Sequence, residues 1–168
     1  MPFHDVNNKF VFLALMSKVF KYQSYLDKYK NCPKDCQEKD ISAYRWVHQI
    51  PTPSNFYPVN ATPGVAPREV DDNDSMCASY ALSLFKDADS AVKKYLHDFN
   101  RQDRPSKREK FKANKGSFAS KVHITKEDGI CDEPDFKGHF NFFEYERCDL
   151  LTSISETLDI FAYNGATE

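Results

Sequence analysis

Five prolines lie between residues 51 and 67, directly after the segment ISAYRWVHQI at positions 41–50. Proline fixes φ and lacks a backbone N–H donor, so neither a helix nor an interior strand can run through that region. The preceding segment is rich in aromatic and β-branched residues, which favours a strand that ends at Pro51. We therefore expect a strand at 41–50, followed by a proline-rich and then acidic connection over residues 51–75.

Three further segments have the composition of strands. Their aromatic and aliphatic residues alternate or cluster over eight or nine positions, which is typical of buried or half-buried strands. These segments are residues 77–85 (CASYALSLF), 118–125 (FASKVHIT) and 139–146 (HFNFFEYE). Together with 41–50 they predict a mostly antiparallel sheet of about four or more strands.

The clearest predicted helix covers residues 8–30, where apolar side chains recur every three or four positions. Its first half is apolar on almost every side, so it lies either in the core or against another chain, in an oligomer or complex. A middle helix is expected over about 88–99, capped by Asp87, and a short C-terminal helix over 153–161. This order of elements predicts a single α+β domain over residues 1–168.

Cysteine use and apolar runs bear on the compartment. Five cysteines without regular spacing indicate reduced thiols. The Cys32–Cys36 pair would need two further zinc ligands, which His123, Cys131 and His139 offer only at eight-residue intervals unusual for a zinc finger, so no metal is expected. The apolar run at 10–16 is followed by Lys18 and by no cleavage motif, and no run reaches the ~20 residues of a membrane span. The sequence predicts a cytoplasmic protein without membrane contact.

Charge is unevenly distributed along the chain. Residues 93–121 contain ten basic and three acidic side chains, a local net charge of +7, which leaves −9 for the rest because the whole chain carries −2. Residues 101–117 are expected to form a basic loop that meets an anionic partner. The candidate binding residues are Arg104, Lys107, Arg108, Lys110, Phe111, Lys112 and Lys115.

Nucleic acid is one candidate ligand for this basic segment. Clustered lysine and arginine attract phosphates, and interleaved phenylalanines can stack on bases. His48 and His139 lie in or beside predicted strands and would be candidates for the general acid and base of a ribonuclease. An overall pI of about 6.2 is low for a nucleic-acid-binding domain, which favours a protein partner.

Arg45 in one strand, Ser83 in another and Glu144 in a late strand occur in the order used by ADP-ribosyltransferases. The chain resembles that family in this order alone, because the usual tripeptide around the serine is absent. The resemblance implies an enzyme that uses NAD. Arg45 would hold the dinucleotide phosphates, Ser83 would support the site and Glu144 would orient the ribose.

Binding is the function that the sequence favours over catalysis. The chain has no glycine-rich ligand loop, its charges are segregated, and its first predicted helix is unusually apolar. We therefore expect a small intracellular, non-catalytic accessory protein of the inhibitor, immunity or regulatory-subunit type. Its charged surfaces would engage another protein without a cofactor, and NAD would enter only under the transferase alternative.

Overall fold

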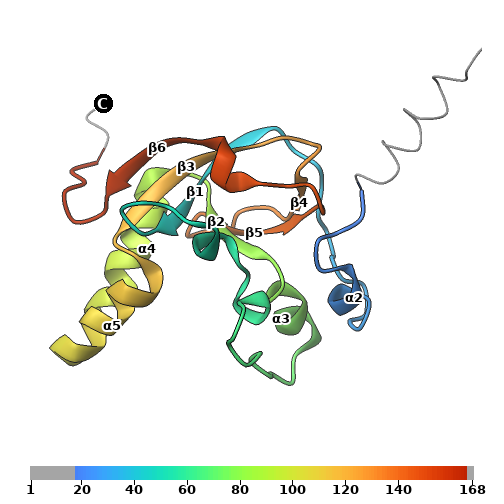
Figure 1. Ribbon diagram of the computed structural model, residues 1–168, viewed down its shortest axis with the longest axis horizontal. Helices are drawn as coiled ribbons and strands as arrows, with labels where there is room; N and C mark the ends of the chain where they lie inside the picture. Colours follow the sequence, from blue (N-terminus) through green and yellow to red (C-terminus); the bar gives the residue numbers. More distant parts are fainter. Residues whose placement is uncertain (1–17, 166–168) are drawn as a thin grey trace, which may run out of the picture.

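The computed structural model describes residues 18–165, and its centre is a six-stranded sheet with the order β4-β5-β2-β1-β3-β6 (Figure 1). Every pair of neighbouring strands is antiparallel. The strands are β1 (Ile41–Val47), β2 (Leu82–Phe85), β3 (Phe118–Ile124), β4 (Gly129–Cys131), β5 (His139–Glu144) and β6 (Ile154–Asp159). The predicted α+β class with a mostly antiparallel sheet is confirmed.

Helices are few and short apart from two. They are α2 (Gln23–Leu26), α3 (Asn73–Ala78), α4 (Ala88–Asn100) and α5 (Pro105–Lys115), with 3₁₀ turns η1 (Pro53–Phe56), η2 (Val59–Ala61) and η3 (Leu150–Ser153). The predicted middle helix with its Asp87 cap is confirmed, since the Asp87 carboxylate accepts a hydrogen bond from the Ser90 N–H at 2.7 Å. Among residues 18–165, no helix has both the length and the apolar character needed to cross a membrane.

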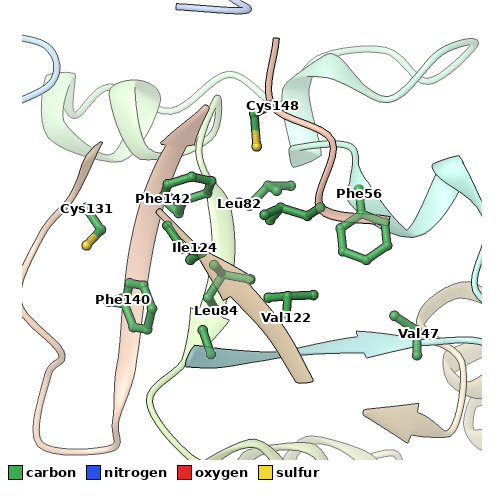
Figure 2. Close-up of a cluster of buried hydrophobic side chains, with 12 residues drawn as sticks. Val47, Phe56, Leu82, Leu84, Val122, Ile124, Cys131, Phe140, Phe142 and Cys148 are labelled. Carbon is green, nitrogen blue, oxygen red and sulfur yellow. The ribbon is translucent and has the colours of Figure 1, made fainter. Parts of the chain in front are cut away.

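One face of the sheet carries the larger apolar cluster, which Figure 2 shows in close-up. Side chains at alternate positions of a strand share a face, so Leu82 and Leu84 of β2 lie beside Phe140 and Phe142 of β5. This face is covered by irregular chain instead of a long helix. The covering side chains include Phe56 from η1 and, from η3 and its approach, Leu150, Leu151 and Cys148.

Helix α4 covers the opposite face of the sheet. Ala91, Val92 and Tyr95 of α4 are buried in a cluster with Phe85, and Trp46 packs against the same cluster. The Trp46 Nε1–H donates to the Ala91 carbonyl at 2.9 Å, which satisfies a polar group that would otherwise be costly next to the core. On this face α4 therefore packs against the sheet at Trp46 and Phe85, while Ser83 in the middle of β2 stays exposed.

A third apolar cluster joins α2, α3 and the β4–β5 end of the sheet, and it contains a disulfide between Cys32 and Cys77. The expectation that all five cysteines are reduced thiols is wrong for this pair. Cys36, Cys131 and Cys148 carry free thiols. The two bonded residues are 45 positions apart, and only the packing of α3 against the 31–36 loop brings them together.

Two predicted elements change type in the structure. The basic loop expected at 101–117 is largely helix α5, which Pro105 opens and Gly116 ends with φ of +75°. A side chain at Gly116 would place its Cβ 1.9 Å from the Val47 carbonyl oxygen. The short helix expected at 153–161 is wrong: most of that segment is strand β6, which pairs with the outer edge of β3.

Two further predictions were wrong in part. Of the strand expected at 77–85, only Leu82–Phe85 is β2, because Asp72 caps α3 and residues 73–78 are helical. The part of the helix expected at 8–30 that precedes residue 18 lies outside the described residues. Within residues 18–30, only Gln23–Leu26 is α-helical. An interface through that helix thus stays a prediction.

Candidate functional site

Three of the five candidate catalytic residues, Arg45, Ser83 and His139, line one cavity of about 510 Å³. The cavity lies where β1 and β2 diverge, since these strands share a single paired position, Tyr44 with Phe85. Its other walls come from the η1–η2 region, the C-terminal parts of α4 and α5, and the turn before β5. A volume of this size is typical of pockets that hold small ligands or side chains of a partner.

Arg45 fills the gap between the diverging strands. Its Nε donates to the Asn55 carbonyl at 2.9 Å, and its Nη1 donates to the Ser83 carbonyl at 2.8 Å. A longer contact of 3.4 Å joins Nη2 to the Tyr57 carbonyl. A guanidinium has five N–H donors, so these contacts leave two for the cavity that Arg45 lines. Desolvation lowers the pKa of Arg45 to about 10, and the group stays cationic at neutral pH.

Ser83 and His139 form a hydrogen-bonded pair in the cavity wall, with 2.7 Å between Ser83 Oγ and His139 Nε2. In the β2–β5 ladder Ser83 faces Asn141 and Phe85 faces His139, so the two residues are diagonal neighbours on one face. Desolvation lowers the pKa of His139 below the usual 6.5. The lowered pKa keeps the imidazole mainly neutral at pH 7, and its tautomer decides which of the two atoms donates: when Nε2 carries the proton, it donates to Ser83 Oγ and the serine O–H can donate to a ligand in the cavity.

The rim of the cavity carries three lysines and two aspartates. Lys94 and Asp98 form an ion pair at 2.6 Å, so their charges offset each other. The Asp135 carboxylate accepts hydrogen bonds from the backbone N–H groups of Lys137 and His139, at 2.8 and 2.9 Å. Once the Lys94–Asp98 pair is set aside, Arg45, Lys115 and Lys137 stand against the single carboxylate of Asp135, a net charge of +2.

Lys115 is the one basic residue among the predicted binding residues of 104–115 that lines this cavity. Its side chain is exposed, and its amine makes no ion pair or hydrogen bond with the residues that the structure describes. Desolvation, followed by the positive charge of Arg45, lowers the pKa of Lys115 below its usual value. The end of α5 therefore places an unpaired ammonium beside a second cation.

The rest of the basic segment does not form one continuous face. Phe111 packs toward the α4 cluster, and helical spacing places Arg108, Lys112 and Lys115 on one side of it and Lys107 and Lys110 on the other. Several of these cations have nearby partners. Lys107 and Arg104 lie 2.8 and 4.0 Å from Asp103, Lys112 lies 3.7 Å from Glu109, and Arg108 and Lys112 lie over the Phe99 ring.

His48 lies outside the cavity lining and links two elements. The Asn55 amide donates to its Nδ1 at 2.8 Å, so Nε2 carries the proton and donates to the Ala113 carbonyl of α5, also at 2.8 Å. Both ring nitrogens are thus used in holding η1 against α5. The structure does not bring His48 and His139 together as an acid–base pair at this cavity.

Glu144 also lies outside the cavity lining. Its side chain is 2% exposed, and one carboxylate oxygen accepts a hydrogen bond from Lys21 Nζ at 2.8 Å. The other oxygen, Oε2, has no hydrogen-bond partner. Burial raises the pKa of Glu144. Arg45 and Ser83 therefore share a cavity, as the resemblance to ADP-ribosyltransferases implies, but Glu144 does not join them there.

Sequence reasoning missed Phe136, whose side chain is 92% exposed at the tip of the turn before β5. Phe136 lines a second cavity of about 520 Å³, which shares Lys94 and Lys137 with the first. Lys94 and Lys137 were missed as well. Lys94 lies within the basic stretch 93–121, so the charge count contained a signal for it, whereas the segment around Lys137 showed only turn residues.

Comparisons with known proteins identify no relative. Among residues 18–165, no three or more His, Cys, Asp or Glu side chains are grouped so that they could hold a metal ion. No family model matches the chain, and no curated protein or solved structure is significantly similar to it. A function is therefore argued from the geometry of the two cavities.

Proposed function

We propose that this protein is a non-catalytic binding protein, of the inhibitor, immunity or regulatory-subunit type, that engages a partner protein through the face carrying the two cavities. The observation that supports this proposal is the position of Phe136. Its almost fully exposed aromatic ring lines one of two cavities that share Lys94 and Lys137. Exposed aromatic residues with charged neighbours are typical of the energetic centres of protein interfaces.

The turn that carries Phe136 is held by hydrogen bonds on both sides. The Gly138 N–H donates to the Asp135 carbonyl at 2.9 Å, and the Lys86 N–H donates to the Gly138 carbonyl at 2.8 Å. Gly138 has φ of +76°, and a Cβ there would lie 2.3 Å from Ser90 Oγ on α4. A ring presented on a fixed turn loses little conformational entropy on binding. Its burial would contribute about 1.5–3 kcal/mol.

The charges around Phe136 favour a protein over a polyanion as the partner. Four lysines lie beside it, but Asp87 and Asp89 line the same cavity. A nucleic acid would bring its phosphates against these aspartates as well as the lysines, so part of the attraction would be lost, whereas a protein can offer charges of both signs around an apolar pocket. The lysines concerned are Lys86, Lys93, Lys94 and Lys137.

Selection from a displayed random-peptide library tests this proposal. We expect the wild-type protein to enrich peptides that combine apolar residues with Asp or Glu, and Phe136→Ala to weaken a synthesised consensus peptide about tenfold or more in fluorescence anisotropy. Ile50→Ala is the matched control, because Ile50 is 80% exposed and does not line either cavity. Equal loss in both variants, or tighter binding of a 20-nucleotide oligothymidylate than of any selected peptide, would contradict the proposal.

A cytoplasmic location is a further part of this proposal, and the Cys32–Cys77 disulfide bears on it. Disulfides persist mainly in oxidising compartments, so a cytoplasmic protein would be expected to hold this pair reduced. Because Cys131 and Cys148 are buried, the thiols are fixed by acid quenching of the cells and then alkylated under denaturing conditions, and the mass of the protein distinguishes the two cases. Five alkylated cysteines support the cytoplasmic location, and three contradict it.

A further inference from the structure

We infer that the cavity between β1 and β2 is a binding site for the dianionic phosphoryl group of a phosphate monoester. Arg45, Lys115 and Lys137 would surround it, with the Ser83 hydroxyl and the Asn114 amide as neutral donors. If the phosphoryl group belongs to a phosphorylated residue of a partner protein, this inference rests on the proposed function and names what the partner presents. A free phosphate ester has the same chemistry and is the alternative source of the group.

Charge balance selects a phosphoryl group over a carboxylate. Beyond the Lys94–Asp98 pair, the cavity carries a net charge of +2 from three cations and Asp135. A phosphate monoester carries about −1.5 to −2 at pH 7, whereas a carboxylate would offset half of the excess. Among the described residues that line the cavity, Asp135 is the one carboxylate left to repel such a ligand. Its Oδ1 already accepts two backbone N–H groups, which offset part of its negative charge.

The positions of the donors also fit a tetrahedral group. Arg45 comes from β1, Lys115 from the end of α5, and Lys137 from the turn before β5, so cations approach from three separate elements. Arg45 is already fixed by its bonds to the Asn55 and Ser83 carbonyls, and two of its N–H donors remain. A fixed arginine with free donors binds a phosphate oxygen without first having to be ordered.

Lys115 gives a second reason to expect an anion. It lines the same cavity as Arg45 and forms no ion pair with a carboxylate among the described residues. Desolvation and then the charge of Arg45 lower the pKa of Lys115, and the Asp98 carboxylate opposes this in part. A dianion placed between the two cations would reverse the repulsion. Lys110 lies on the same helix, has no ion pair in the described structure and does not line the cavity. A change at Lys110 therefore measures only the general electrostatic attraction of an anion to this helix.

Calorimetric titration of the full chain with pyrophosphate at pH 7.5 and about 150 mM salt tests the site. We expect Lys115→Gln to weaken binding about tenfold, the loss typical of one charge-assisted hydrogen bond, and Lys110→Gln to change it less than twofold. Ser83→Ala should weaken it by a smaller factor. Absence of binding at 10 mM pyrophosphate, or equal weakening by the two lysine variants, would overturn the inference.

Two further probes distinguish the sources of the phosphoryl group. A phosphoserine hexapeptide that binds more tightly than both its unphosphorylated form and glucose 6-phosphate indicates a partner protein, and the reverse order indicates a free ester. Failure of this site is separable from failure of the proposed function. Peptides selected for Phe136-dependent binding would still bind if the cavity takes no phosphate, and pyrophosphate would still bind if Phe136 contacts no partner.

Discussion

Arg45 is a half-buried charged side chain and Glu144 is a buried one, and the fold satisfies them in different ways. Arg45 directs N–H donors at backbone carbonyls of Asn55, Ser83 and Tyr57, which lie on two separate segments. Glu144 has a single cationic partner, Lys21, and its second oxygen has none. The Arg45 guanidinium thus supplies donors to several carbonyl groups at once. Around Glu144, by contrast, one buried carboxylate oxygen is left without a donor.

This difference follows from where each residue lies in the sheet. β1 and β2 share only one paired position, so Arg45 replaces missing ladder hydrogen bonds between β1, β2 and the η1 region. Glu144 ends β5, where the Lys21 N–H also donates to its carbonyl at 2.9 Å. Arg45 therefore joins β1, β2 and η1 within the sheet, while Glu144 holds the segment before α2 at the end of β5.

The largest effect is expected from Arg45→Met. It leaves two or three carbonyls without their donors, and a group left unsatisfied costs about 1–3 kcal/mol, so we expect a loss of roughly 3 kcal/mol in the free energy of unfolding. Urea unfolding followed by the fluorescence of Trp46, the single tryptophan, measures it. Arg147→Met is the control, since Arg147 is exposed. A loss below about 0.5 kcal/mol would show that the junction of β1, β2 and η1 does not depend on Arg45.

A smaller loss, of about 2 kcal/mol, is expected from Lys21→Met at pH 7. The change leaves a buried carboxylate unpaired, which is the costly case for an ion pair, although Lys21 itself is partly exposed. The double variant Lys21→Met with Glu144→Gln should recover much of the loss, because the remaining charge is removed. Urea unfolding of the wild type, the two single variants and the double variant gives the coupling free energy between Lys21 and Glu144. Lys34→Met is the control, because Lys34 is exposed on the 31–36 loop.

Much of this fold was predictable from local patterns, and the sites were not. Aromatic and β-branched composition predicted strands at 41–50, 118–125 and 139–146, which contain β1, β3 and β5. Asp87 correctly marked the start of α4. β6 was missed because its pairing with β3 is a long-range contact, and Ser153 followed by Glu156 imitates a helix start. Local patterning does not record which edge of a sheet remains to be paired.

Arg45 and Ser83 were chosen from their order along the chain and His139 as a candidate acid or base, and the sheet order brings all three to one cavity. No spacing along the chain could show this, because β1, β2 and β5 become neighbours only through antiparallel pairing. Glu144 was chosen with them from chain order alone. Its position at the end of β5, beside Lys21, could not be deduced without the strand register.

The pH dependence of stability gives a further, smaller effect that is specific to Glu144. Because burial raises its pKa above the usual 4.5, the folded state binds more protons than the unfolded state just above that pH. This contribution to stability is complete below pH 4.5 and is lost as the pH rises through the folded-state pKa. Glu144→Gln removes it, so the variant should gain stability relative to wild type from pH 4 to pH 7 in urea unfolding. A constant or falling difference would contradict a raised pKa.

The smallest effect concerns His139 and tests whether charges at the cavity act separately from the Lys21–Glu144 pair. Lys94 and Arg45 both contribute to the lowered pKa of His139, after desolvation, whereas Glu144 is not among its causes. Lys94→Gln should therefore raise the pKa of His139 toward 6.5, as measured by NMR titration of its ring protons, and Glu144→Gln should leave it unchanged.

Binding of sulfate to the cavity should also depend on pH. The His139 imidazole becomes positively charged only below its pKa, and the charge of sulfate is constant over this range. Sulfate should therefore bind more tightly as the pH falls toward 5. If Glu144→Gln shifted His139 as much as Lys94→Gln, the two regions would form one electrostatic unit, and the contrast between Arg45 and Glu144 would not describe how this molecule uses its buried charges.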